Sequence, residues 1–147
     1  MLPKCFKPTG TFDLIRMGSD HDGGYLVDPN SIEESSALLA LGIGRNWSFE
    51  RDFIGKKRVK IHAYDYSIGI GFWIKHFIKR LFSILIGKLF APYRAIKLYL
   101  EFKAFFNEHA VLFMEKIGTS KGCDTNLNEA LERLADRPIF LKVDILI

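Results

Sequence analysis

Four short apolar segments alternate along the chain with segments of helical pattern, and this alternation constrains the fold more than any other feature of the sequence. The apolar segments cover residues 37–41, 59–64, 110–117 and 139–147. Strands that are apolar along their whole length are typical of parallel sheets with helices on both faces, and parallel neighbours need long, usually helical, crossovers. We therefore predict an α/β fold with a doubly wound, mostly parallel sheet.

The segments between these strands carry helix signals. Ser48 is positioned to cap a short helix that begins soon after the first strand. Asn126 and Glu129 have the spacing of a capping box and precede an apolar helix face. Residues 66–107 predict two helices divided at Pro92, and they exceed the dozen or so residues that a crossover needs. We interpret residues 66–107 as a helical insertion between the second and third strands.

The sequence predicts one domain preceded by a short lead-in. Its 147 residues suffice for one substantial core. Residues 1–36 are rich in turn signals and contain an apolar stretch at 25–27 that predicts a short strand. We expect residues 1–36 to form the lead-in and residues 37–147 to form the sheet domain.

Positive charge is concentrated in one part of the sequence. Residues 66–100 contain six Lys or Arg residues and no acidic residue, whereas the rest of the chain contains 15 basic and 17 acidic residues. The basic character therefore belongs to one segment and does not make a general nucleic-acid-binding surface. We therefore expect no nucleic-acid partner.

The basic segment also has an amphipathic pattern. Apolar residues recur at positions 74, 78, 81, 85 and 89, with lysines and arginines largely on the other side. Charges interrupt every window long enough to span a bilayer. Either residues 72–106 contact a membrane surface peripherally, or they pack on the sheet as a lid with solvated lysines; we favour the lid.

A glycine turn and a later acidic residue give the strongest indication of a ligand site. Gly42 and Gly44 follow the first strand directly, and Asp65 ends the second strand, 21 residues after Gly44. Glycine lets a backbone approach a ligand closely, and the next helix offers free N–H groups. An acid about 20 residues further on binds ribose hydroxyls in nucleotide-binding α/β folds. The pattern predicts a nucleoside site, or else a turn that merely joins strand and helix.

Trp47 stands where the dinucleotide-binding fingerprint requires a third glycine. This difference argues against a pyrophosphate packed on the helix, and therefore against an enzyme that uses a nicotinamide cofactor. It suits a nucleoside ligand without phosphates, such as S-adenosylmethionine. Trp47 itself is expected to pack in the core rather than to stack on an adenine ring.

Several motifs resemble those of class I S-adenosylmethionine-dependent methyltransferases. The stretches LLALGIGRNWSFERDF, VKIHAYD and VLFMEKIG, in this order, are similar to the first three strand motifs of that class. The stretch DTNLNEALERLADRPIFLKVDI resembles the signature of the FkbM-type family, and LIRMGSDHDGGYLV resembles a segment that precedes the core in a branch of that family. The resemblance covers residues 12–65 and 110–145, and it implies part of a Rossmann-like fold.

The resemblance implies roles for four residues. Gly42 and Gly44 would pass under the methionine and ribose of S-adenosylmethionine, and Asp65 would hold the ribose hydroxyls. Asp144, at the tip of the fourth strand, would lie beside the methyl group and is the candidate catalytic base. The implied reaction is methyl transfer, foremost to an oxygen atom, with a small-molecule, glycan or lipid acceptor.

The last motif departs from the FkbM pattern. The Glu-Gly that follows the aspartate in that family is replaced here by Ile145-Leu146. We therefore expect a chain truncated after the strand-four motif, with little activity of its own and an unpaired apolar strand edge that promotes self-association. The alternative is a non-catalytic, membrane-peripheral interaction module with a degenerate nucleotide-binding fold.

Other features carry less weight. Residues 1–20 lack the apolar run of a secretory signal, and the two cysteines are too few for a disulfide framework. A cytoplasmic location is therefore expected, with membrane contact at most peripheral. Asp20, His21 and Asp22 are better explained by turn chemistry than as metal ligands, so no metal site is expected. His62 is interpreted as a packed strand residue.

Overall fold

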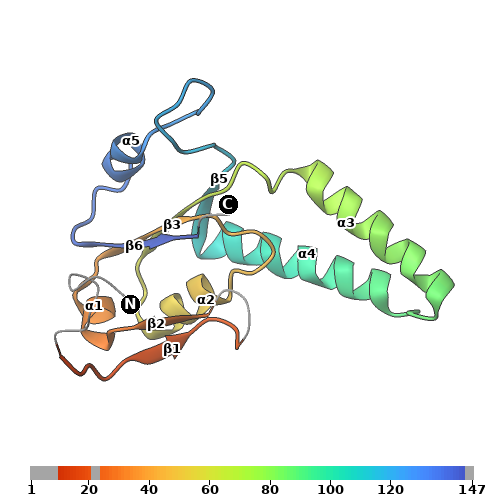
Figure 1. Cartoon of the computed structure of the whole chain (residues 1–147), viewed down its shortest axis with the longest axis horizontal. Helices are drawn as coiled ribbons and strands as arrows, with labels where there is room; N and C mark the ends of the chain where they lie inside the picture. Colours follow the sequence, from red (N-terminus) through yellow and green to blue (C-terminus); the bar gives the residue numbers. More distant parts are fainter. Residues whose placement is uncertain (1–9, 21–23, 145–147) are drawn as a thin grey trace, which may run out of the picture.

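The computed structural model describes residues 10–20 and 24–144, and Figure 1 shows how their elements are arranged. In chain order these elements are β1 (Ile15–Met17), β2 (Tyr25–Val27), α1 (Pro29–Glu34), β3 (Ala37–Leu41), α2 (Ser48–Lys56), β4 (Lys60–Tyr64), α3 (Ile70–Phe82), the short 3-10 helix η2 (Ser83–Ile86), α4 (Ala91–Glu108), β5 (Ala110–Phe113), α5 (Leu127–Glu132) and β6 (Ile139–Val143).

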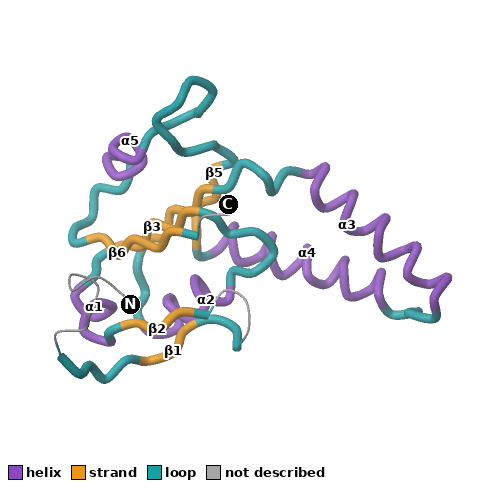
Figure 2. Tube along the Cα trace, in the orientation of Figure 1, coloured by secondary structure: helices purple, strands orange, loops and turns teal. Residues whose placement is uncertain are grey.

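Four strands form one parallel sheet, which Figure 2 shows as a group apart from the small β1–β2 pair. The strand order is β5-β4-β3-β6, and every neighbouring pair is parallel. Leu41, which ends β3, lies opposite Tyr64 of β4 and Val143 of β6. The predicted α/β class with a parallel sheet is confirmed, and the arrangement is compatible with a Rossmann-like fold. The segments that follow β3, β4 and β6 therefore meet at one edge of the sheet.

Helices cover both faces of this sheet, but unequally. Leu38 and Ala40 of β3 belong to a core that also contains residues of β1, β2, α2, α3 and α4. Ala37 and Leu39, which point to the opposite face as alternate strand residues do, pack against α5 and the residues just after it. In Figure 1, α5 accordingly lies on the other side of the sheet from α2 and α4. The larger core therefore lies on the face that carries the helical insertion.

The insertion forms a helical hairpin that projects away from the sheet (Figure 1). Near the sheet the ring of Trp73 packs against Tyr99 and Phe102, with ring centroids 5.4 and 5.0 Å apart. The two predicted helices are present, but they are divided before Pro92. Gly87, with φ of +79°, follows η2, and Pro92 lies in the first turn of α4, where the missing N–H of proline costs nothing.

The third strand is shorter than predicted. It ends at Phe113, because Lys116 pairs with a later loop instead of continuing along β4. The backbone N–H of Lys116 donates to Asp124 Oδ2 at 2.8 Å, and the backbone N–H of Asp124 donates to the carbonyl of Lys116 at 2.9 Å. The apolar pattern did not reveal this loop contact, and the predicted strand therefore extended to residue 117.

The two predicted helix caps have different outcomes. The capping box of α5 is confirmed: Asn126 Oδ1 accepts from the backbone N–H of Glu129, whose carboxylate accepts from the backbone N–H of Asn126. The prediction for Ser48 is wrong. Trp47 occupies the cap position without a side-chain bond, and the Ser48 hydroxyl donates to Asn46 Oδ1 at 2.6 Å. The Ser48 hydroxyl therefore bonds to the asparagine two residues earlier instead of capping the helix.

The lead-in shares the core of the sheet domain. Strands β1 and β2 pair antiparallel, so the short strand predicted at residues 25–27 is present. Met17 and Ile32 are fully buried in the same cluster as the residues of β3. The backbone N–H of Gly18 donates to Asp52 Oδ2 of α2 at 2.8 Å. The lead-in is thus fixed to the helix that follows the glycine turn.

Candidate functional site

The glycine turn at the end of β3 has the backbone geometry that requires glycine. Gly42 and Gly44 have φ of +78° and +56°, in the left-handed region that other residues rarely adopt. A Cβ on Gly42 would also collide with the carbonyl oxygen of Asp144, whereas a Cβ on Gly44 would meet no atom within 4 Å. Gly42 is therefore needed for both conformation and close approach, and Gly44 for conformation alone.

Asp65 holds this turn in place. Its Oδ2 accepts hydrogen bonds from the backbone N–H groups of Ile43 at 3.0 Å and Gly44 at 2.8 Å. Its Oδ1 accepts from the backbone N–H of Ser67 at 2.8 Å and from the Ser67 hydroxyl at 2.6 Å. Although burial by itself raises the pKa of Asp65, the bonds from Ser67, Gly44 and Ile43 outweigh it and leave the pKa below its ordinary value.

These bonds bear on the predicted ribose contact. A carboxylate offers about four acceptor positions, and four protein donors already use them in Asp65. A ligand hydroxyl would have to replace one of these donors. Ser67 is exposed and Ile43 is only 3% exposed, so the bonds from Ser67 are the easier ones to exchange.

Asp144 lies on the other side of the same turn. Its backbone N–H donates to the carbonyl of Leu41 at 2.8 Å, which places it beside Gly42. Its side chain is 44% exposed, with Oδ2 3.8 Å from Lys142 Nζ. The structure therefore brings the four predicted site residues to one edge of the sheet, with Asp65 on the β4 side of the turn and Asp144 on the β6 side.

Sequence reasoning missed a buried ion pair beneath the turn. Lys142 Nζ lies 3.0 Å from Glu50 Oε1 and donates to the carbonyl of Gly42 at 3.1 Å. The side chains of Lys142 and Glu50 are 3% and 0% exposed. Burial raises the pKa of Glu50 above its ordinary value, and the positive charge of Lys142 opposes that rise. The signal in the sequence was a single charge within an otherwise apolar strand, which nearly always needs a partner when buried.

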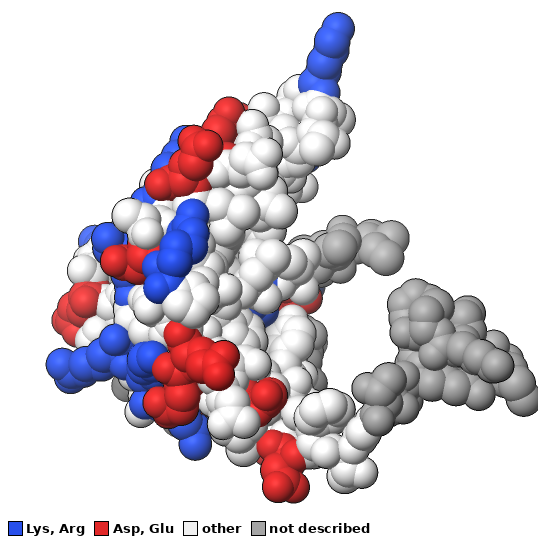
Figure 3. Space-filling model, turned by 90° about the vertical axis from the view of Figure 1, so that its left-hand side faces the viewer, with Lys and Arg blue, Asp and Glu red and all other residues white. Residues whose placement is uncertain are grey.

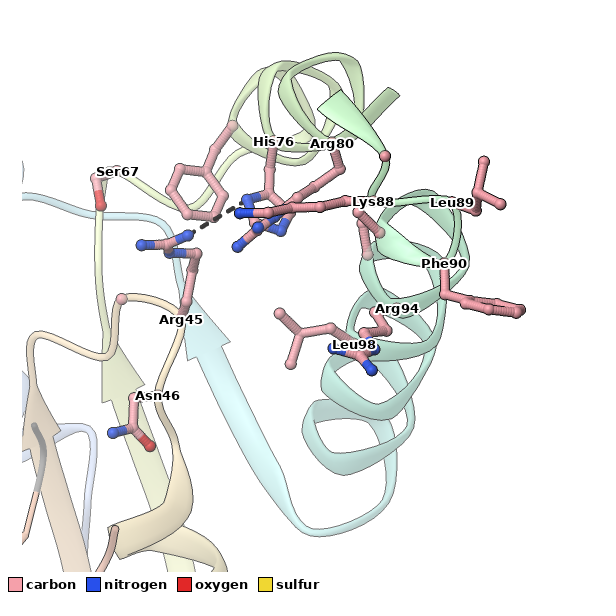
Figure 4. Close-up of a pocket in the computed structure, with 15 residues that line it drawn as sticks. Arg45, Asn46, Ser67, His76, Arg80, Lys88, Leu89, Phe90, Arg94 and Leu98 are labelled. Carbon is pink, nitrogen blue, oxygen red and sulfur yellow. Dashed lines mark hydrogen bonds between the residues drawn. The ribbon is translucent and has the colours of Figure 1, made fainter. Parts of the chain in front are cut away.

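A cavity of about 1020 Å³ opens beside the glycine turn. Residues 44–46 and Ser67 form one wall, and the helical hairpin forms the other (Figure 4). Four permanent cations line it: Arg45, Arg80, Lys88 and Arg94, which we call the cavity cations. They come from the turn, from α3, from the loop after η2 and from α4.

The positive charge of this cavity is uncompensated within the described chain. None of its lining residues is acidic, and no salt bridge among residues 10–20 and 24–144 includes a cavity cation. Arg45 Nη1 lies 3.4 Å from His76 Nδ1. Burial, aided by the charges of Arg45, Arg80 and Lys79, holds the pKa of His76 below its ordinary value. The hairpin cations were visible in the sequence, but the addition of Arg45 from the glycine turn was not.

The remaining candidates lie apart from this cavity. Trp47 is 5% exposed and packs edge-on against Phe102 with ring centroids 5.3 Å apart, so the predicted core packing is confirmed. His62 is buried within β4 beside Phe113, as interpreted from the sequence. Of the Asp-His-Asp stretch at 20–22, only Asp20 lies within the described residues. The described part of the chain contains no group of three or more side chains arranged to hold a metal ion.

Within the described residues, no helix has both the length and the apolar character needed to cross a membrane. Comparisons with models of known protein families, with curated proteins and with solved structures found no match to this chain.

Proposed function

We propose that this chain binds S-adenosylmethionine and supplies the cofactor-binding strands of an FkbM-type methyltransferase. The proposal depends mainly on the 2.8 Å hydrogen bond from the backbone N–H of Gly44 to Asp65 Oδ2. It joins the glycine turn of one parallel strand to the acid that ends the neighbouring strand, which is the arrangement that α/β folds use for a nucleoside. The motif resemblance of the sequence supports the same assignment.

The proposal assigns the nucleoside to the space above the turn. Its ribose hydroxyls take over acceptor positions on Asp65 Oδ1 that the exposed Ser67 now uses. The Oδ2 bonds to the turn remain, so the ligand binds without unfolding the loop. Gly42 and Gly44 present backbone rather than side chains to the cofactor.

Asp144 is the proposed base on the far side of the turn. The bound cofactor supplies a sulfonium methyl group that an acceptor oxygen can attack in line. Asp144 accepts the proton of that oxygen, and its half-exposed carboxylate is open to an acceptor from solvent. The turn and Asp144 mainly align the two reactants, which lowers the barrier by making the displacement effectively unimolecular.

Isothermal titration of the chain with S-adenosylmethionine and, separately, with NAD tests the proposal. We expect saturable heat with S-adenosylmethionine alone. Gly44→Ala should weaken the binding of S-adenosylmethionine, because φ of +56° at this position disfavours a side chain. Gly55→Ala in α2 should leave the binding unchanged. Binding of NAD alone would favour a nicotinamide enzyme. Binding of neither ligand by a chain with a folded circular-dichroism spectrum would contradict the proposal.

A second candidate function rests on the end of the helical hairpin. Leu85, Ile86 and Phe90 there are 82%, 72% and 72% exposed, close to Lys88. Exposed apolar residues beside lysine and arginine suit the surface of an anionic membrane. We propose, as the alternative, a non-catalytic module that binds membranes through this end.

Co-sedimentation with vesicles tests the alternative. Wild-type chain is expected to pellet with vesicles that contain anionic lipid, and the triple change Leu85→Ser, Ile86→Ser and Phe90→Ser should abolish pelleting. Ile70→Ser, at an apolar position that is 68% exposed at the base of the hairpin, serves as the control. Equal, negligible pelleting with neutral and anionic vesicles would contradict membrane binding.

A further inference from the structure

The cavity beside the glycine turn has the wrong charge for the proposed cofactor. S-adenosylmethionine carries a sulfonium cation and an ammonium group against a single carboxylate, whereas the cavity is lined by four cations and, among its described residues, by no acid. Like charges repel, so a cationic ligand is disfavoured there. The cavity therefore fits a second, anionic ligand rather than the methyl donor.

The cavity cations converge from separate parts of the chain. Figure 4 shows Arg45 reaching from the turn toward His76 on α3, while Arg80 and Lys88 extend from the opposite wall into the same space. Bringing these charges together costs free energy in an empty cavity. Burial lowers the pKa of His76, and the charges of Arg45, Arg80 and Lys79 lower it further. A concave site lined by one sign of charge focuses its field and attracts ligands of the other sign.

The chemistry of the lining favours phosphate among anions. Arginine forks bind phosphate oxygens in pairs, and lysine adds a mobile point charge. The lining also contains the hydroxyl of Ser67 and the apolar side chains of Phe72 and Leu98. A volume of about 1020 Å³ is far larger than a phosphate ion needs and lies near the upper end for organic ligands.

The charge distribution argues against an extended polyanion such as nucleic acid. On the side of the molecule that faces away from the hairpin, blue and red residues are interspersed (Figure 3). The four cavity cations instead surround one cavity of limited size. A nucleic-acid surface would need a basic stripe that continues over the fold.

We propose that the cavity binds an organic phosphate with more than one negative charge, held by the cavity cations while Phe72 and Leu98 contact its apolar part. The inference does not rest on S-adenosylmethionine binding, because none of the cavity cations is assigned to the cofactor, although Gly44 and Ser67 border both sites. The phosphate has two sources, a soluble phosphate ester or the headgroup of an anionic lipid, and the exposed apolar end of the hairpin adjoins the cavity.

A pair of charge-matched double variants tests the proposal. The test variant is Arg80→Gln with Arg94→Gln, which removes one cavity cation from each helix. The control is Lys75→Gln with Lys103→Gln, which removes the same charge from exposed positions of the same helices outside the cavity. All four residues are exposed, so both variants should fold, and circular dichroism checks this.

Two probes separate the sources: inorganic pyrophosphate by calorimetry, and vesicles of phosphatidylcholine with phosphatidic acid by co-sedimentation. We expect wild-type chain to bind at least one probe, the test variant to bind it about tenfold more weakly or worse, and the control to remain close to wild type. If the test variant loses binding to pyrophosphate alone, the phosphate comes from a soluble ester. If it loses binding to the vesicles alone, the phosphate is a lipid headgroup. Binding of neither probe, or equal weakening in both variants, would overturn the proposal.

Discussion

Lys142 Nζ lies 3.0 Å from Glu50 Oε1 inside the core, directly beneath the glycine turn, although the two residues are 92 positions apart in sequence. The same ammonium group also donates to the carbonyl of Gly42. The ion pair thus links β6, α2 and the turn that carries the candidate site. Buried pairs of this kind cost desolvation free energy, which their mutual attraction offsets only while both partners are present.

Removing one partner of this pair should therefore be costly. We expect Lys142→Met to lower the free energy of unfolding by about 3–5 kcal/mol, because Glu50 is left buried without a counter-charge. The double variant Glu50→Leu with Lys142→Met should return to within about 1 kcal/mol of the wild type. Urea titration of the single and double variants measures both values.

Lys60→Met provides the control for that experiment. Lys60 and Asp136 are about half-exposed and 3.7 Å apart, so losing their pair should cost at most about 1 kcal/mol. If Lys60→Met and Lys142→Met lowered the free energy of unfolding equally, burial of the Lys142–Glu50 pair would not contribute to the cost of breaking it.

Three glycine-to-alanine changes should have different effects. Gly42→Ala is expected to destabilise the fold by about 1–3 kcal/mol or more, from left-handed backbone strain and the collision with the Asp144 carbonyl. Gly44→Ala suffers only the strain and should cost less. Gly55→Ala, in α2 with open space around it, should stabilise by about 0.5–1 kcal/mol. Thermal melts of the three variants measure the order, and a stabilising Gly42→Ala would contradict the turn geometry.

His62 should make stability depend on pH. Burial, aided by Lys60 and Arg133, lowers its pKa below the ordinary 6.5, and its Nδ1 has no hydrogen-bond partner in the described chain. The unfolded chain then binds the proton more tightly, so stability falls as the pH drops through about 6.5 toward the folded pKa. His62→Leu should reduce this fall.

Denaturant titrations at several pH values compare the two proteins. His76, whose pKa is also lowered, contributes in the same direction to both proteins and cancels in their difference. Identical pH dependence of wild type and His62→Leu would exclude His62 as a cause.

The edge of β6 should promote self-association. In the described sheet β6 is an outer strand, and its Leu141 and Val143 are 43% and 44% exposed. An unpaired apolar strand edge pairs readily with another copy. We expect the wild-type chain to elute as oligomers in sizing chromatography and Leu141→Lys to shift it toward the monomer.

Val111→Lys is the matched change for that experiment. It adds the same charge at the opposite edge strand, β5, where Val111 is 47% exposed. An equal shift with both variants would assign the effect to net charge. A sharp monomer peak of the wild type at every concentration would contradict self-association.

Much of the sheet could be predicted from sequence because its signals are local. The apolar run at 37–41 became β3, and residues 139–143 of the run predicted at 139–147 became β6, while residues 145–147 lie outside the described residues. The capping box of α5 is present with the expected partners. The left-handed glycines at 42 and 44 also follow from local conformational preference. Each of these features depends on a few neighbouring residues.

Other features depend on contacts between distant segments. The pairing of Lys116 with Asp124 ended β5 early, and Asn46 took up the hydroxyl expected to cap α2. These are competitions between hydrogen-bond partners, and an apolar pattern does not report their outcome.

The sequence by itself determined the α/β class, the parallel strands and the positions of the glycine turn and its acid, because apolar periodicity and glycine geometry act locally. Only the tertiary structure paired Lys142 with Glu50, filled the acceptor positions of Asp65, and placed Arg45 opposite the hairpin cations. Burial and charge depend on what the folded chain brings together. The electrostatics of both candidate sites were therefore decided by packing.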